Sequence, residues 1–215
     1  MMTIQQEFLS LMERGGPIMW IIFFVACSAM TLVVWEAIRG HVLIKSARRD
    51  YARLRSSNDN LLITSGNMSP VAQLLATIHW PNVQSKEDIA REINIHLPEI
   101  IPKMEGSLAT IAILGSLLPM LGLLGTVTGM INVFEVIALH GSGQPDEMAE
   151  GISQALLTTA SGLIIAIPVI FLHHLLSRRI NVLVAMTHQA IQLILHRDVS
   201  TLKKAALERV PYNVN

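Results

Sequence analysis

The side chains that could do chemistry inside the apolar stretches of this sequence are hydroxyls and one amide. Thr126 lies in one stretch, and Gln154, Thr158 and Thr159 lie in another. Acids, bases and histidines are the usual carriers of protons and ions through a membrane, but the middle of each apolar stretch contains none of them. The chain alone therefore lacks a protonatable relay, and a partner helix could bring the missing acid.

Thr126 and Thr159 hold matching positions in their stretches. Thr126 precedes Glu135 by nine residues, and Thr159 follows Glu150 by nine. In an antiparallel pair of helices both would lie about 13 Å below the outer membrane surface. A threonine can also satisfy its hydroxyl on the carbonyl four residues earlier in its own helix. That alternative stays open, although the shared depth and the neighbouring Thr158 weigh against it.

Small residues accompany the hydroxyls, and Gly125 and Gly129 have the spacing that lets two helices approach closely. These small faces either pack the two helices of one chain together or form a smooth wall that admits a partner helix. Two prolines at comparable depth either kink their helices or open a cavity. The residues concerned are Gly122, Gly125, Gly129, Ala155, Gly162, Pro119 and Pro168.

No catalytic residue or metal site is predicted. A phosphate-binding glycine loop with its lysine, a zinc-protease HExxH motif and a nucleophile elbow are all missing from the sequence. His173 and His174 are consecutive and diverge on a helix, so a shared metal ion is not expected. The formal net charge is zero, with no basic footprint for nucleic acid.

The elements that must position these residues are three transmembrane helices. Uncharged runs of 21, 29 and 27 residues reach or exceed the roughly 20 that cross a bilayer. We expect an all-α integral membrane protein whose second and third helices are long and extend into the cytoplasm. The predicted segments are an N-terminal segment 1–14, transmembrane helices 15–35, 106–134 and 151–177, a cytoplasmic segment 36–105, a periplasmic loop 135–150 and a cytoplasmic tail 178–215.

Lysines and arginines predict the orientation of the chain. Residues 36–105 carry nine and the tail from Arg178 carries six, whereas the N-terminal segment has only Arg14 and the loop 135–150 has none. The positive-inside rule then places the N-terminus outside and the C-terminus in the cytoplasm. Within the cytoplasmic segment, Ser69-Pro70 predicts the start of a short helix, and Ser85 with Asp88 predicts a capping box.

Two long motifs resemble those of the ExbB/TolQ/MotA proton-channel family, closest to its ExbB branch. The first is Leu118-Pro119-Met120-Leu121-Gly122-Leu123-Leu124-Gly125-Thr126-Val127-Thr128-Gly129-Met130. The second runs from Gly151 to Leu163 and continues as Ala166-Ile167-Pro168. Gly15-Gly16-Pro17-Ile18-Met19-Trp20 resembles the opening of ExbB-like proteins. Gln154 departs from the family's usual glutamate, which puts any proton transfer at that position in doubt.

The resemblance implies a multi-pass protein of the bacterial inner membrane that assembles as a homopentamer. Its pore would enclose single-span ExbD- or TolR-like partners, each bringing a membrane aspartate. Thr126 and Thr159 match the threonines that line the proton path opposite that aspartate, with Thr158 and Gln154 as further polar lining. The resemblance implies no cofactor, with protons as the coupling ion.

The function implied by the resemblance is that of an ExbB-like motor subunit. Inward proton flow would drive its partners, and a TonB-like protein would pass the work to outer-membrane receptors. A TolQ-like role in envelope integrity is the close alternative. A MotA-like stator is disfavoured because that branch has four spans. A scaffold that packs partners without conducting protons is the alternative from another class.

Overall fold

The computed structural model of the chain describes residues 2–56, 69–141 and 144–207, and within these ranges it contains helices and no strand. Three helices are long and apolar enough to cross a membrane, so the expected all-α membrane protein with three spans is confirmed. The elements are α1 (Met2–Ser56), α2 (Pro70–Thr77), the short 3₁₀-helix η1 (Trp80–Asn82), α3 (Lys86–Glu105), α4 (Leu108–His140), α5 (Pro145–Leu195) and α6 (Val199–Leu207).

The chain divides into two compact units, and α1 and α5 each contribute to both. The first unit comprises Met1–Trp35 and Ser107–Leu175, and the second comprises Glu36–Gly106 and Leu176–Asn215. The long helices run beyond the predicted membrane segments. The segment boundaries and the N-out orientation therefore stay predictions.

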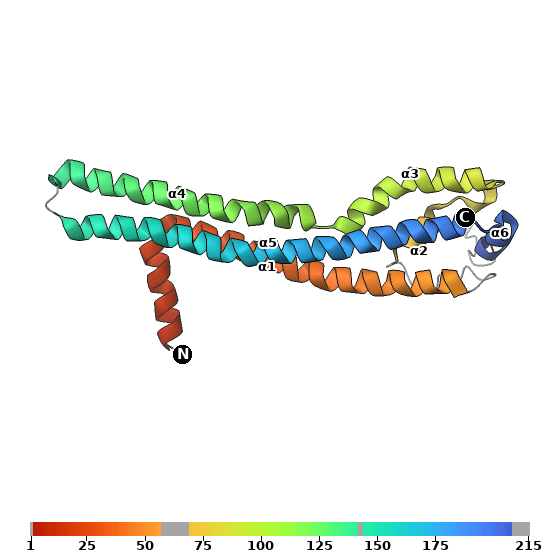
Figure 1. Cartoon of the computed structure of the whole chain (residues 1–215), viewed down its shortest axis with the longest axis horizontal. Coiled ribbons are helices and arrows are strands. Elements are labelled where there is room, and N and C mark those ends of the chain that lie inside the picture. The colour runs from red at the N-terminus through yellow and green to blue at the C-terminus, as the bar shows by residue number, and fades with distance from the viewer. Residues whose placement is uncertain (1, 57–68, 142–143, 208–215) are drawn as a thin grey trace, which may run out of the picture. The chain divides into compact units, whose positions relative to one another are not determined.

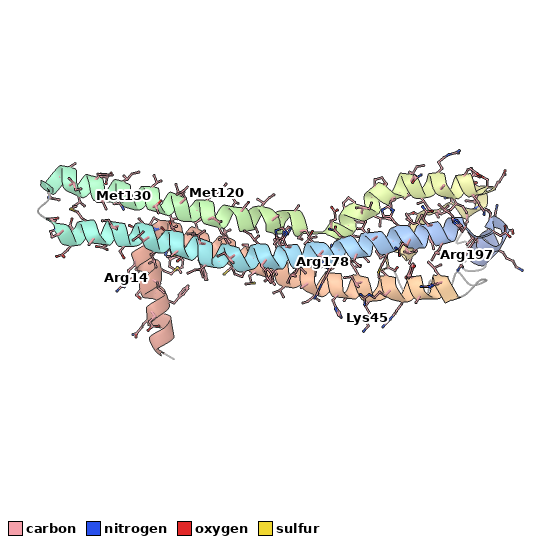
Figure 2. All side chains as sticks on the ribbon, in the orientation of Figure 1. Arg14, Lys45, Met120, Met130, Arg178 and Arg197 are labelled. Atoms are coloured by element: carbon pink, nitrogen blue, oxygen red, sulfur yellow. The ribbon has the colours of Figure 1, made fainter. Side chains whose placement is uncertain are left out.

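In the first unit, α4 and α5 form an antiparallel hairpin whose helices lie side by side (Figure 1). The buried residues of α4 recur at helical spacing and form one face, which includes Gly115, Gly122, Gly125 and Gly129. The other faces are apolar and exposed. Met120, for example, is 64% exposed (Figure 2). An apolar surface on the outside of a helix hairpin suits lipid or another membrane helix.

Helix α1 turns sharply at Gly16, whose φ of 65° and ψ of −165° interrupt the helical conformation. A positive φ is accessible to glycine at little cost, and Pro17 then restarts the helix with its fixed φ. The segment before the turn leaves the rest of the helix at a steep angle (Figure 1). Phe8 holds it there through an edge-on ring contact with Phe23, with centroids 5.3 Å apart.

The second unit has a conventional core of large apolar side chains. The cluster draws on α2, α3 and the later part of α5, and its fully buried members include Leu74, Ile89 and Ile194. Trp80 also belongs to this cluster, and it donates its indole N–H to the carbonyl of Leu75 at 3.2 Å. From α6, Lys203 donates to the carbonyls of Pro81 and Val83.

Both sequence-based helix starts in this unit are confirmed. Helix α2 begins at Pro70, and α3 begins with the predicted capping box. The Ser85 hydroxyl accepts from the backbone N–H of Asp88 at 3.2 Å, and the Asp88 carboxylate accepts from that of Ser85 at 3.0 Å. Backbone donation from Gln84 and Ser85 holds the pKa of Asp88 below its usual value.

Candidate functional site

The glycines of α4 lie directly against the threonines of α5. A Cβ added at Gly122 would stand 3.1 Å from both the carbonyl oxygen of Thr158 and the Cα of Thr159. A Cβ at Gly125 would overlap the side chain of Thr158. Such close approach is possible only because glycine has no side chain, and it places the two helix backbones in contact at the candidate site.

The same packing continues on both sides of the threonines. A Cβ at Gly129 would lie 2.8 Å from the Cβ of Ala155, and one at Gly162 would lie 2.6 Å from the carbonyl oxygen of Leu118. The small residues singled out in the sequence therefore pack α4 against α5 within one chain. Pro119 is half-buried and Pro168 is exposed, and the helices continue through both.

Two of the predicted hydroxyls are satisfied within their own helix. Thr158 is fully buried and donates to the carbonyls of Gln154 and Ala155 at 3.1 and 2.9 Å. Thr126 is half-buried and donates to the carbonyl of Leu123 at 2.6 Å. Thr158 thus makes the bond to the carbonyl four residues earlier that the sequence left open as an alternative, whereas Thr126 bonds to the carbonyl three residues earlier.

Thr159 behaves differently, because its hydroxyl reaches across the hairpin. It donates to the carbonyl of Gly122 on α4 at 2.9 Å and is half-buried. The absence of a side chain at Gly122 exposes that carbonyl to the neighbouring helix. Thr159 is therefore the one predicted site residue for which the structure gives a hydrogen bond joining α4 to α5, and a hydroxyl in this position can exchange partners if the helices shift.

Gln154 lies one turn from Thr158 and points toward α1. Its amide group meets the position that a Cβ at Gly16 would occupy, at the turn of α1. A glutamine there can pack and form hydrogen bonds, but it carries no titratable proton. The sequence singled out Gly15-Gly16-Pro17 only as part of a motif. The contact between this turn and Gln154 becomes visible only when the folded chain brings α1 and α5 together.

The face of α5 beside the threonines is hollowed and apolar. An open cavity of about 500 Å³ is lined by Ala149, Ile152, Ser153, Leu156, Leu157 and Ala160. Leu156 is 65% exposed there. This surface has the size and apolar character to receive another membrane helix or lipid chains.

The two consecutive histidines of α5 contact each other. The rings of His173 and His174 meet edge-on with centroids 5.3 Å apart. Within residues 2–56, 69–141 and 144–207, no group of three His, Cys, Asp or Glu side chains could hold a metal ion.

The chain is similar to a known protein family and to several known proteins. Residues 68–189 match the model of the MotA/TolQ/ExbB proton channel family. The chain is 36% identical over 118 residues to the Tol-Pal system protein TolQ of Pseudomonas aeruginosa, covering 54% of this chain and 51% of TolQ. It is 41% identical over 108 residues to the biopolymer transport protein exbB1 of Vibrio cholerae, covering 50% of this chain and 46% of exbB1.

A longer match joins the chain to the biopolymer transport protein ExbB of Neisseria meningitidis. It is 25% identical over 214 residues and covers 86% of this chain and 96% of that protein. The matches to TolQ and exbB1 span about half the length of those relatives. The residues matching the family model include the hairpin that carries Thr126 and Thr159.

Proposed function

Because this chain belongs to the MotA/TolQ/ExbB proton channel family, we propose that it is the channel-forming subunit of a proton-driven motor in the bacterial inner membrane. In this proposal it forms a homopentamer around single-span ExbD- or TolR-like partners. Protons are the coupling ion, and a TonB-like protein transmits the work to outer-membrane transport. No enzymatic step is assigned to the chain.

The observation that carries this proposal is the hydrogen bond from Thr159 to the carbonyl of Gly122 at 2.9 Å. It sets a polar group with an exchangeable proton between two apolar helices that otherwise pack through glycine and alanine. The middle of the apolar stretches contains no acid or base, so proton uptake and release must occur on a partner. The hydroxyl of Thr159 would then accept from or donate to that partner's acid.

The remaining predicted residues have graded roles in the proposal. Thr126 is half-buried and can supply a second hydroxyl along the path. Thr158 is fully buried under Gly125, which favours a role in holding the hairpin together. Gln154 faces the turn of α1 and serves as polar lining there, without carrying a proton. The hollow face of α5 from Ala149 to Ala160 would receive a neighbouring helix of the assembly.

The experiment that tests the role of Thr159 compares two substitutions. Thr159→Ser keeps the hydroxyl, whereas Thr159→Val keeps the shape and removes it. The chain is co-expressed with the single-span protein encoded beside it, and assembly is measured by native mass spectrometry. We expect both variants to assemble as five copies with the partner. In cells, we expect only the serine variant to support outer-membrane transport. Unimpaired outer-membrane transport in cells with the valine variant would contradict the role of Thr159.

Resemblance to TolQ supports an envelope-maintenance role as the second candidate. The two roles differ in what a deletion strain loses. Impaired uptake of iron complexes with normal resistance to detergents would favour the ExbB-like role. Detergent sensitivity with normal uptake would favour the TolQ-like role. A non-conducting scaffold would leave the membrane impermeable to protons even with its partner bound, a prediction that proton-flux measurements can test directly.

A further inference from the structure

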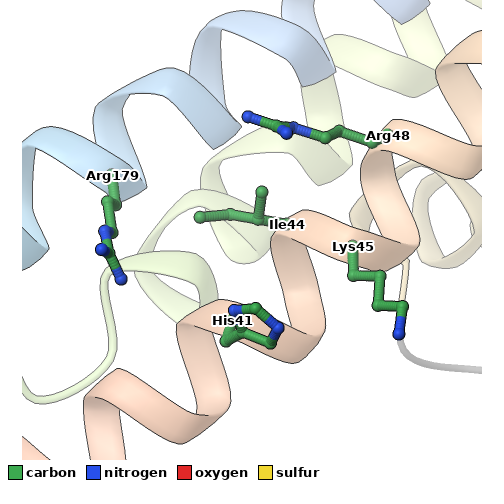
Figure 3. A pocket seen from close by; sticks show the side chains of 5 residues that line it. All are labelled: His41, Ile44, Lys45, Arg48 and Arg179. Atoms are coloured by element: carbon green, nitrogen blue, oxygen red, sulfur yellow. The ribbon is translucent and has the colours of Figure 1, made fainter.

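The second unit contains a basic cavity of about 490 Å³ between α1 and α5. Four of its lining residues, His41, Ile44, Lys45 and Arg48, come from α1, and Arg179 comes from α5. Arg48 reaches from α1 toward α5, and Arg179 extends from α5 toward α1 (Figure 3). The two helices come close together nearby. A Cβ added at Gly40 of α1 would lie 3.6 Å from the Cδ1 of Ile180 on α5.

The cavity carries positive charge, and in the part of the chain that the structure describes none of its cations is held in an ion pair. Among the described residues, Lys45, Arg48 and Arg179 form no ion pair. The sequence has no acid between Glu150 and Asp198, so the wall formed by α5 has none. On α1, Glu36 is fully buried and paired with Arg39 at 3.0 Å, and Asp50 is fully buried. Three cations, Lys45, Arg48 and Arg179, therefore face one open space.

The chemistry of the lining suits a phosphate group. Guanidinium groups bind phosphate oxygens with two parallel hydrogen bonds, and a lysine ammonium adds a compact charge. Ile44 supplies an apolar wall beside them. The volume lies within the range of about 300–1,000 Å³ typical of pockets for small ligands. A phosphate ester with an apolar part would satisfy both kinds of surface.

The position of the cavity along the helices points to the membrane surface. Arg179 follows Arg178, the residue that ends the uncharged stretch of α5, and His41 follows Trp35 by six residues. At about 1.5 Å per helical residue, His41 lies about 9 Å beyond Trp35. The headgroup layer occupies the first several ångströms beyond the hydrocarbon. Anionic lipids give that layer a negative potential on the cytoplasmic side, which attracts lysine and arginine.

We propose that the cavity formed by His41, Ile44, Lys45, Arg48 and Arg179 binds a phosphate-bearing anion. The source can be the headgroup of an anionic phospholipid or a soluble phosphate compound, and its position favours the lipid. This inference concerns the second unit and does not require the proposed proton path. A lipid bound here would fix α1 to α5 where both helices leave the apolar region.

The test uses the full-length chain in nanodiscs of mixed phosphatidylglycerol and phosphatidylcholine. Native mass spectrometry then measures the phosphatidylglycerol retained by each chain after mild delipidation. One variant carries Lys45→Gln, Arg48→Gln and Arg179→Gln. A matched control carries Arg49→Gln, Arg55→Gln and Arg178→Gln, which removes the same charge from exposed residues outside the cavity. A second arm measures thermal stabilisation of both variants by inorganic phosphate.

We expect preferential retention of phosphatidylglycerol by the wild-type chain. The affinity for phosphatidylglycerol should fall roughly fivefold for each cation removed from the cavity, which amounts to a fall on the order of a hundredfold for the triple variant. The control should change far less. Loss of stabilisation by inorganic phosphate in the cavity variant alone would support the site with a soluble ligand. If the triple variant does not assemble, Lys45→Gln alone provides the fivefold comparison.

Two results would overturn the proposal. Equal losses in the cavity variant and the control would show that overall charge, and not this cavity, attracts the lipid. Unchanged retention and phosphate response together with an altered number of copies in the cavity variant would show that a second copy of the chain covers this surface.

Discussion

The two units of this chain pack their helices by different means. In the first, α4 and α5 meet through Gly122, Gly125, Gly129 and Ala155, and backbone atoms lie where side chains would otherwise stand. In the second, large side chains such as Ile93, Leu74 and Trp80 form a closed cluster. Most of the large apolar side chains of the first unit are instead exposed on its outside.

This difference is the one expected from the predicted placement of the first unit in lipid and of the second unit in water. Lipid chains are as apolar as leucine, so burying leucine between two membrane helices gains little, and close backbone packing takes over. A unit surrounded by water gains about 25 cal/mol for each Å² of apolar surface that it buries, and therefore gathers its large side chains inside. The composition of the buried positions thus agrees with the predicted environment of each unit.

The largest expected effect comes from removing a large core side chain in the second unit. Ile93 is 1% exposed, so Ile93→Ala should lower the free energy of unfolding by about 2–5 kcal/mol. Ile164 in the first unit is 69% exposed, and Ile164→Ala should have little effect. Thermal unfolding of both variants in mild detergent measures this. Equal destabilisation would break the comparison between the units.

Adding one methyl group at a glycine should have opposite effects in the two units. At Gly162 the new Cβ would stand 2.6 Å from the backbone oxygen of Leu118, and such overpacking costs about 1–3 kcal/mol. At Gly40 the nearest atom is the flexible end of Ile180 at 3.6 Å. Gly40→Ala should therefore stabilise its helix by about 0.5–1 kcal/mol. The unfolding midpoints of both variants show whether each substitution stabilises or destabilises the protein. A stabilising Gly162→Ala would contradict the close backbone contact.

The capping box at the start of α3 gives a smaller effect, confined to the second unit. Ser85→Ala should cost about 1 kcal/mol because the N–H of Asp88 loses its acceptor. The measurement is the thermal midpoint of the purified protein, with the exposed Ser153→Ala as the control in the first unit. A larger loss of stability in the control than in Ser85→Ala would contradict the predicted contribution of the helix cap to the stability of the second unit.

The lowered pKa of Asp88 predicts a dependence of stability on acid pH. The carboxylate is favoured in the folded state, so its contribution is complete above the usual pKa of 3.8 and disappears as the pH falls through the lower folded-state pKa. Asp88→Asn should lower stability at neutral pH and reduce its fall in acid. Unfolding midpoints measured from neutral pH downward test this, and parallel curves for the two proteins would contradict it.

The smallest expected effect on stability is that of the hydroxyl joining α4 to α5. Thr159→Val should destabilise the hairpin by about 0.6 kcal/mol, an average contribution for a hydrogen bond between membrane helices. Thr126→Val should change it less, because the hydroxyl of Thr126 bonds within its own helix. Unfolding in detergent measures both variants. A large loss of stability in Thr159→Val would assign Thr159 mainly to packing.

Local sequence patterns predicted the parts of the fold that local physics controls. Uncharged runs predicted three apolar helices, Ser69-Pro70 predicted the start of α2, and Ser85 with Asp88 predicted a cap. The contacts of the candidate site depend on which helix faces which. Nothing in the neighbouring residues distinguishes Thr159, which bonds to α4, from Thr158, which bonds to its own helix.

Two further features depend on long-range contacts that the sequence does not reveal. The basic residues of α1 and Arg179 served only to predict orientation, because their shared cavity forms when α1 and α5 come together. Gly16 and Pro17 carry a local signal for a turn, since a glycine before a proline favours a break in a helix. The contact between that turn and Gln154 needed the folded chain.

The most direct test of the account is proton flux into liposomes. The chain is reconstituted with the single-span protein that co-purifies with it, and acidification of the lumen is followed after an imposed pH gradient. We predict flux for the complete complex and for its Thr159→Ser variant, and little for Thr159→Val or for the chain without the partner. A fully assembled complex that remains impermeable to protons would contradict the channel and favour a scaffold.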